Sequence, residues 1–123
     1  MPDYRPPDYG PPAQPPPRWA DSWGAIVLDA KGGAKGVATD KESKGEAVRD
    51  AMAECQATGA KNCKVELTYY NQCAAVAWGD QSFGIANNPS IEGASSAANT
   101  ACKRGGTGCR TVYTACSVAR RIR

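Results

Sequence analysis

The 123-residue sequence contains no histidine. This absence excludes Ser-His-Asp and Cys-His catalysis, because imidazole is the general base in both, and it removes the usual ligand of zinc hydrolases. No apolar run approaches the ~18 residues that a membrane-spanning helix needs. Only 7% of the residues are aromatic, with a single phenylalanine, so large side chains are few in an alanine-rich domain.

A secretory signal is also missing, since no hydrophobic segment follows Met1. The six cysteines indicate an oxidising compartment, because disulfides stabilise the modest core of so short a chain. We therefore expect an exported protein, located in the periplasm, anchored at the outer membrane or secreted, whose leader is missing and replaced by Met1. Sequencing the native precursor tests this expectation. Tethering to a membrane through the missing leader is an alternative that stays open.

Prolines divide the chain into regions. Eight of the nine lie in residues 1–22, which predicts a Pro-rich disordered or polyproline II linker or spacer. A PxxP ligand at residues 12–15 is a weaker alternative. The remainder predicts an α+β domain over residues 23–119 and a basic tail over residues 120–123.

The basic tail contains Arg120, Arg121 and Arg123, and residues 73–123 carry six basic side chains against two acidic ones. Such an end can attract an anionic partner, or it can be a solvated tail that aids solubility. No nucleic-acid-binding motif or interleaved aromatic residue accompanies the charge, so specific nucleic-acid binding is not expected.

The region of residues 23–116 contains the same pattern twice. The first copy predicts strands at 23–28 and 34–39, a helix at 43–55 and a strand at 63–70. The second predicts strands at 73–78 and 82–87, a helix at 90–102 and a strand at 109–116. Repeat arrays need about three units. Two copies therefore predict one α+β domain, a pseudo-symmetric ββαβ-ββαβ repeat with a mostly antiparallel sheet and two helices.

The predicted helices share a start signal and a buried face. Ser43 and Ser90 are placed to cap their first turns. The predicted buried faces consist of small residues at helical spacing: Ala47, Val48, Ala51, Met52 and Cys55, and Ala94, Ala97, Ala98, Ala101 and Cys102. Between the helices, residues 63–70 alternate, which predicts one buried face of Cys63, Val65, Leu67 and Tyr69.

The repeat also proposes a disulfide pairing. Cys55 and Cys63 flank one helix-to-strand turn, and Cys102 and Cys109 flank its counterpart. Cys73 and Cys116 then remain to connect the two copies. Six cysteines allow fifteen pairings, so the sequence alone leaves the others open. A zinc site is disfavoured because CxxC pairs are absent.

No catalytic group is predicted. The candidate carboxylates Asp29, Asp40, Asp80 and Glu92 lie at turns or helix starts, and nothing in the sequence pairs them. The glycine-rich segments 32–36 and 105–108 lack phosphate-loop spacing and are predicted to be tight turns.

Aromatic residues provide the candidate partner contacts. Trp23, Trp78 and Phe83 are expected in the core. Tyr70 is the first candidate for an exposed contact, since it lies on the strand face opposite Tyr69. Further candidates are Trp19, Arg120, Arg121 and Arg123.

Three segments carry a family resemblance: Trp23-Gly24-Ala25-Ile26, Cys63-Lys64-Val65 and Cys73-Ala74-Ala75-Val76-Ala77. Residues 23–116 resemble a domain-of-unknown-function family of small secreted bacterial proteins. The resemblance implies export and a double ββαβ fold, and it supplies no catalytic residue. Some members look like secreted effectors or like immunity proteins beside antibacterial toxins.

The sequence therefore favours a non-enzymatic, disulfide-stabilised protein-binding module of the bacterial envelope, without a cofactor or metal. Its partner is expected to be a protein, such as a toxin or hydrolase that it inhibits. The alternatives are a secreted effector that acts on a host or competitor cell, with or without enzymatic activity, and a structural envelope protein. Neighbouring genes would distinguish the immunity and effector hypotheses.

Overall fold

The computed structural model describes residues 18–122, so most of the predicted linker and Arg123 lie outside the described residues. The first unit consists of β2 (Trp23–Asp29), β3 (Ala34–Lys41), α1 (Lys44–Ala57) and β4 (Lys64–Tyr70). The second consists of β5 (Gln72–Trp78), β6 (Phe83–Asn88), α2 (Ile91–Lys103) and β7 (Arg110–Ser117). The predicted α+β class is confirmed, and the elements follow the expected ββαβ-ββαβ order.

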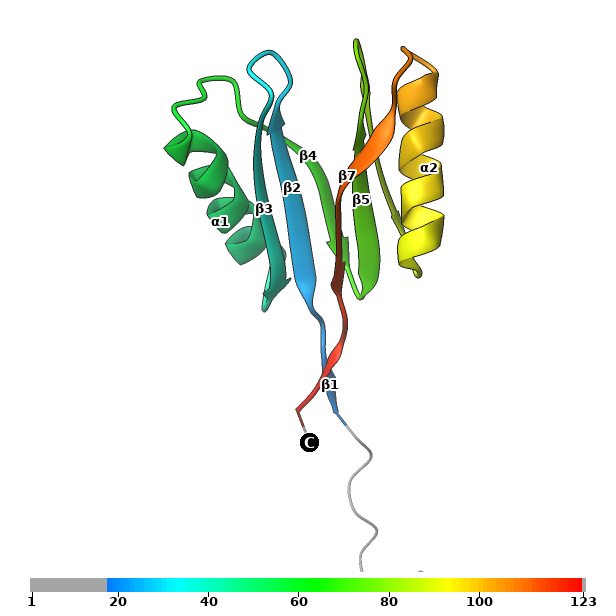
Figure 1. The fold of residues 1–123 in the computed structure, drawn as a ribbon. Helices are drawn as coiled ribbons and strands as arrows, with labels where there is room; N and C mark the ends of the chain where they lie inside the picture. The colour runs from blue at the N-terminus through cyan, green and yellow to red at the C-terminus, as the bar shows by residue number, and fades with distance from the viewer. Residues whose placement is uncertain (1–17, 123) are drawn as a thin grey trace, which may run out of the picture.

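The strands of each unit form their own antiparallel sheet, with the orders β3-β2-β4 and β6-β5-β7 (Figure 1). In the chain, the single residue Asn71 separates β4 from β5; it has a φ of 53° and turns the backbone from the first sheet into the second. The sequence predicted one sheet. Alternation within strands does not distinguish one sheet from two, because it reports only which faces are buried.

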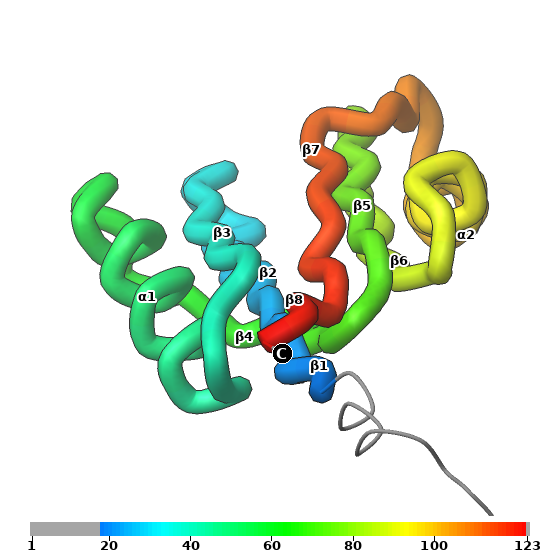
Figure 2. The backbone as a smooth tube through the Cα atoms, turned by 90° about the horizontal axis from the view of Figure 1, so that it is seen from below, coloured from blue at the N-terminus to red at the C-terminus, as the bar shows by residue number. Residues whose placement is uncertain are grey.

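The sheets face each other, and one helix covers each outer face, so the order of layers is α1, sheet, sheet, α2 (Figures 1 and 2). In β2, Ala25 and Val27 pack under α1, whereas Ile26 and Leu28 pack between the sheets. The central strands β2 and β5 are therefore buried on both faces, which explains why both are nearly continuous apolar runs.

The helices lie close against their sheets, as their small residues predicted. The buried residues are Ala47, Ala51 and Cys55 in α1 and Ala94, Ala98 and Cys102 in α2, at equivalent positions. The prediction for Ala97 was wrong, because this side chain is exposed. Both predicted caps are present: the Ser43 and Ser90 hydroxyls accept hydrogen bonds from the N–H groups of Glu46 and Gly93.

The predicted alternation of residues 63–70 breaks at one point. Val27 pairs with Val65, whereas Ile26 pairs with Leu67, so Glu66 is an extra residue in β4. This β-bulge shifts the register, and Val65 is 42% exposed instead of buried. The bulge recurs at the equivalent position of β7, where Val112 is the extra residue.

All three predicted disulfides are present: Cys55–Cys63, Cys73–Cys116 and Cys102–Cys109. The role expected for Cys73–Cys116 was wrong, however. These residues are directly opposite each other on the neighbouring strands β5 and β7, so the bond lies within the second sheet. It does not connect the two copies.

The copies are connected instead by the core between the sheets and by the chain ends. β1 (Trp19–Ala20) pairs with β8 (Arg120–Arg121) in a two-stranded ribbon. The predicted boundaries therefore change: residues 18–22 join the folded part, and residues 120–121 form a strand instead of a tail. We call the end of the molecule with this ribbon, Asn71 and the start of both helices the lower end (Figure 1).

Candidate functional site

The lower end gathers exposed apolar side chains. Seven large apolar residues are exposed in the described part of the chain, and five of them lie at this end: Trp19, Tyr70, Ile91, Val118 and Ile122. The other two, Val65 and Val112, belong to strand segments nearer the upper end. Concentrated exposed apolar residues mark contact surfaces more often than scattered ones do.

Tyr70 is more than half exposed and packs on Trp23, with 4.8 Å between the ring centroids. The two residues are opposite each other on β4 and β2. Beside them is a hollow of about 310 Å³ lined by residues 68–72 and Asn87. Trp23 is half-buried against the core under α1, as expected, whereas the ring of Tyr70 is presented to solvent. Its role as a partner contact stays a prediction.

The ribbon brings the other predicted contacts to the same end. Trp19 pairs with Arg121, and Ala20 pairs with Arg120. Because side chains alternate along strands, Trp19 and Arg121 share one face of the ribbon. The Arg120 guanidinium lies 3.8 Å from a carboxylate oxygen of Glu42. The structure thus places Trp19, Arg120 and Arg121 together in the ribbon, at the same end of the molecule as Tyr70, the last residue of β4.

Above the ribbon, a polar group connects the two copies. The buried Ser22 hydroxyl donates to the Asp40 carboxylate at 3.1 Å, and the Asp40 N–H donates to the hydroxyl of buried Ser117 at 3.1 Å. Asp40 has a φ of 58°, a conformation that few residues adopt. The two serine hydroxyls have no exposed surface from which to attack a substrate, so this group is structural.

The phenol of Tyr69 lies next to this group. Burial raises the pKa of Tyr69, and the Ser117 hydroxyl nearby opposes that rise. The Tyr69 hydroxyl is nevertheless buried without a hydrogen bond of normal geometry among the described residues. Sequence reasoning missed this group, because Ser22, Asp40 and Ser117 are far apart in the chain.

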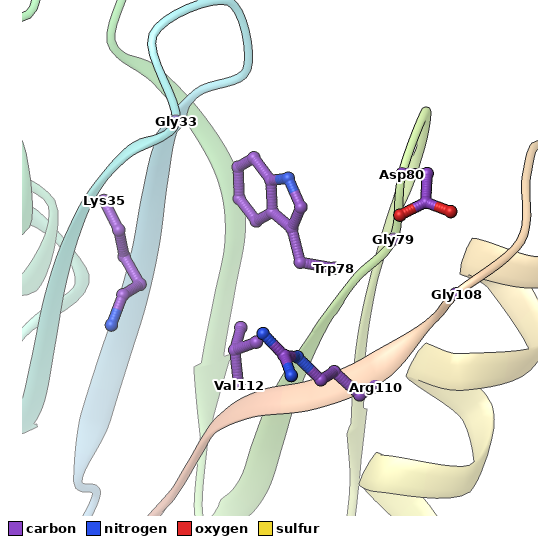
Figure 3. A pocket seen from close by; sticks show the side chains of 8 residues that line it. All are labelled: Gly33, Lys35, Trp78, Gly79, Asp80, Gly108, Arg110 and Val112. Carbon is purple, nitrogen blue, oxygen red and sulfur yellow. The ribbon is translucent and has the colours of Figure 1, made fainter.

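At the upper end, a cleft of about 610 Å³ opens between the two sheets (Figure 3). It is lined by Gly33, Lys35, Trp78, Gly79, Asp80, Gly108, Arg110 and Val112. The Lys35 ammonium lies 4.9 Å from the centroid of the Tyr113 ring, and burial raises the pKa of Tyr113 to about 12. The sequence indicated a core position for Trp78 and a turn near Lys35, and it did not single out Arg110.

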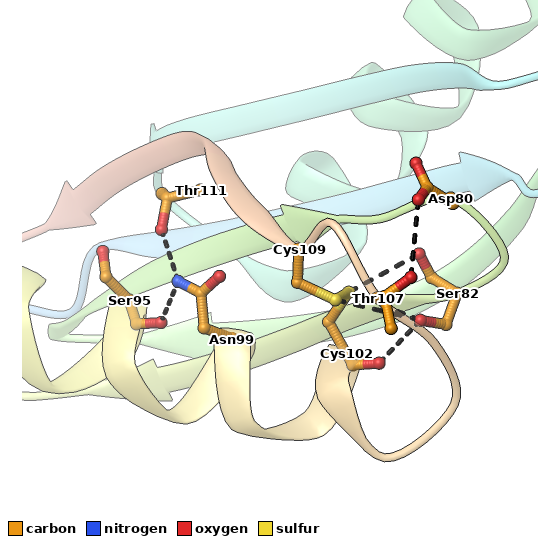
Figure 4. Close-up of a disulfide and its surroundings, with 8 residues drawn as sticks. All are labelled: Asp80, Ser82, Ser95, Asn99, Cys102, Thr107, Cys109 and Thr111. Atoms are coloured by element: carbon orange, nitrogen blue, oxygen red, sulfur yellow. Dashed lines mark hydrogen bonds between the residues drawn. A yellow bond between two sulfur atoms is a disulfide. The ribbon is translucent and has the colours of Figure 1, made fainter.

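The carboxylates of Asp29 and Asp80, at the two hairpin turns, each accept hydrogen bonds from loop residues of their own copy. Asp29 accepts hydrogen bonds from the N–H groups of Lys31, Gly32 and Asn62. These hydrogen bonds hold the pKa of Asp29 below its usual value, and the bond from Gly32 has the largest effect. In the second copy, the Thr107 hydroxyl donates to Asp80 (Figure 4). Both acids are therefore occupied in structural roles.

The second of these loops is stabilised further around the Cys102–Cys109 disulfide. The Ser82 hydroxyl donates to the Cys102 carbonyl at 2.6 Å, and the Asn99 amide donates to the Thr111 hydroxyl at 2.8 Å (Figure 4). These contacts join the end of the loop before β6, α2 and the start of β7. They hold the wall of the upper cleft that carries Arg110.

The described residues, 18–122, contain neither a metal-binding cluster nor a membrane-spanning helix. No group of three or more acidic or cysteine side chains in this range is arranged to hold a metal ion. None of the helices there is long and apolar enough to cross a membrane.

Comparison with known proteins identifies one family. Neither the curated proteins nor the solved structures contain a match to this sequence. A family model with the description "Domain of unknown function (DUF4189)" matches residues 23–116, which is the region of the two ββαβ copies. This match confirms the resemblance to a domain-of-unknown-function family. The chain belongs to the DUF4189 family.

Proposed function

We propose that this protein is a non-enzymatic, exported protein-binding module whose lower end docks a protein partner. The observation that carries the proposal is the concentration of exposed apolar side chains there, five of the seven in the described residues. Trp, Tyr and Arg are the residue types that dominate binding energy in protein interfaces, and Trp19, Tyr70 and Arg121 supply one of each.

The lower end suits a partner with an apolar patch beside acidic side chains. Trp19 and Tyr70 offer apolar ring area at a small cost in side-chain entropy, because each has two rotatable angles. Arg121 adds positive charge at the rim, whereas the charge of Arg120 is partly offset by Glu42. Positive charge there speeds association with an acidic surface. We propose a toxin or hydrolase that this protein inhibits as the partner, and the three disulfides agree with an exported location.

The test is affinity capture. The oxidised full chain is immobilised and exposed to envelope and secreted fractions of its own source. We expect one stoichiometric protein whose affinity falls about 30-fold in Trp19→Ala and in Tyr70→Ala, as for interface residues worth about 2 kcal/mol. Adding the protein to the purified partner should abolish that partner's lytic or hydrolytic activity.

Val65→Ala is the matched control, since Val65 is exposed on the same strand as Tyr70 but nearer the upper end. This variant should bind as the parent does. Capture that is unchanged in Trp19→Ala and Tyr70→Ala would contradict docking at the lower end. A specific partner found only in a host lysate would favour the effector hypothesis instead.

A further inference from the structure

Two cationic residues, Lys35 and Arg110, line the upper cleft at strand positions that face the other sheet. The residues of the core between the sheets that share this face are apolar. Side chains alternate along β3, so Lys35 shares the inner face with Val37, which packs in the core between the sheets. On the other wall, Arg110 is directly opposite Trp78, another residue of that core. Two inner-face positions, one from each sheet, are therefore occupied by charged residues.

Neither cation has an acidic partner within the described residues. The ion pairs there are Lys41–Asp50 and Arg120–Glu42, and neither involves the cleft. The contact of Lys35 is with the ring of Tyr113. Asp80 lines the cleft, but its carboxylate accepts the hydrogen bond from Thr107. The Thr107 hydroxyl is neutral and leaves the Asp80 carboxylate with its negative charge, so the lining has two positive charges against one negative. Among the described residues no acidic side chain forms an ion pair with Lys35 or Arg110, and the cleft keeps an excess of positive charge.

Figure 3 shows Lys35 and Arg110 on opposite walls, with Val112 between them and the Trp78 indole above, toward Gly33. Two cations that line one recess attract an anion into it, because the fields of both charges add there. The planar guanidinium suits carboxylate and phosphate groups, which it can bind with two parallel hydrogen bonds. The indole face and Val112 offer an apolar surface of the kind on which a flat ring stacks.

We propose that the upper cleft binds a small anionic ligand that carries a flat ring. Its carboxylate or phosphate lies between the Lys35 ammonium and the Arg110 guanidinium, and its ring lies against Trp78 and Val112. The cleft volume of about 610 Å³ is within the range of small-molecule sites, about 300–1,000 Å³. This site is at the end opposite the proposed protein-binding surface and does not depend on it.

The proposal is tested by NMR titration of the oxidised full chain, with the indole N–H of Trp78 and the amide of Arg110 as reporters. Adenosine monophosphate and benzoate probe the phosphate and carboxylate forms of the ligand. We expect at least one of them to shift both signals saturably. Adenosine, benzamide and inorganic phosphate, which each lack the anion or the ring, should bind at least about tenfold more weakly.

Variants assign the binding to the cleft. The double variant Lys35→Gln/Arg110→Gln should weaken binding of the anionic probe at least about tenfold, the loss expected for a charge-assisted hydrogen bond. The control Lys31→Gln/Arg104→Gln removes the same charge from two exposed positions that do not line the cleft, and its affinity should stay within about twofold.

Three results would overturn the proposal. The first is the absence of any saturable shift at Trp78 with either probe up to about 5 mM, the range of the weakest specific sites. The second is equal binding by the two double variants, when both retain the dispersed spectrum of the folded parent. The third is binding of inorganic phosphate as tight as that of adenosine monophosphate, which would remove the role of the ring.

Discussion

Gly36 and Gly84 are the positions at which each helix approaches its sheet most closely. An alanine Cβ at position 36 would lie 1.9 Å from the Ala51 carbonyl oxygen, and one at position 84 would lie 2.0 Å from the Ala98 carbonyl oxygen. Ordinary van der Waals contact begins at 3.4 Å, so Gly36→Ala has to move α1 away from β3 by roughly 1.5 Å. Both clashing groups belong to backbone, which cannot rotate aside.

Overpacking of a core costs about 1–3 kcal/mol when side chains can adjust. Here a whole helix moves, so we expect Gly36→Ala to lose about 3 kcal/mol or more of unfolding free energy. A domain of this size has about 5–15 kcal/mol in total, and its Tm should fall by at least about 12 °C. Gly84→Ala should behave alike, because its surroundings are equivalent.

The measurement is urea and thermal unfolding of the oxidised protein, followed by circular dichroism. Gly45→Ala is the control: Gly45 lies in the first turn of α1, and a Cβ there meets no other atom. Because alanine favours helix over glycine by about 0.5–1 kcal/mol, this variant should match or exceed the parent. A Gly36→Ala protein within 1 kcal/mol of the parent would refute the close-packing argument.

Three further predictions concern stability. Tyr69→Phe should leave the unfolding free energy unchanged or raise it by up to about 1 kcal/mol, because it removes a buried hydroxyl without a normal hydrogen bond. A loss of unfolding free energy in urea would show instead that the Tyr69 hydroxyl bonds to Ser117. Replacing Cys73 and Cys116 by serine should cost about 4 kcal/mol, against about 2.5 for either shorter disulfide loop, and thermal unfolding of the three double variants tests this order. The lowered pKa of Asp29 means that its carboxylate stabilises the fold above about pH 4 and that this contribution is lost as the pH falls through the lowered value. Asp29→Asn should therefore be less stable at pH 7, and its unfolding free energy should change less between about pH 4 and pH 2 than that of the parent.

Much of the fold could be predicted because local signals and the repeat agree. The helices follow from capping serines and small residues at helical spacing, as at Ala51 and Ala98. The disulfides follow from symmetry, since Cys55 and Cys102 occupy equivalent helix ends. The bulges at Glu66 and Val112 could not be predicted, because a bulge depends on pairing with a neighbouring strand and leaves the sequence pattern of its own strand unchanged.

The candidate sites depended on contacts between distant parts of the chain. Arg120 and Arg121 indicate a solvated tail when read locally, and only pairing with Trp19, about a hundred residues earlier, makes them a strand. Lys35 lies in the glycine-rich segment 32–36, which the sequence predicts to be a tight turn. Its alternation with Val37 nevertheless places it on the inner face of β3. Arg110 becomes part of a cleft only once the two sheets are known to face each other.

A comparison of the two copies shows where stability alone does not explain the sequence. Trp23 and Tyr70 are paired across β2 and β4 at the positions that Cys73 and Cys116 occupy across β5 and β7. A disulfide with this loop length contributes about 4 kcal/mol, whereas an aromatic pair adds about 0.5–1.5 kcal/mol beyond its burial. The first copy therefore has the weaker of the two cross-strand contacts, an aromatic pair instead of a disulfide, and the ring of Tyr70 in that pair is exposed. An exposed ring at a position that could hold a stabilising disulfide is what the proposed binding role of the lower end predicts for Tyr70.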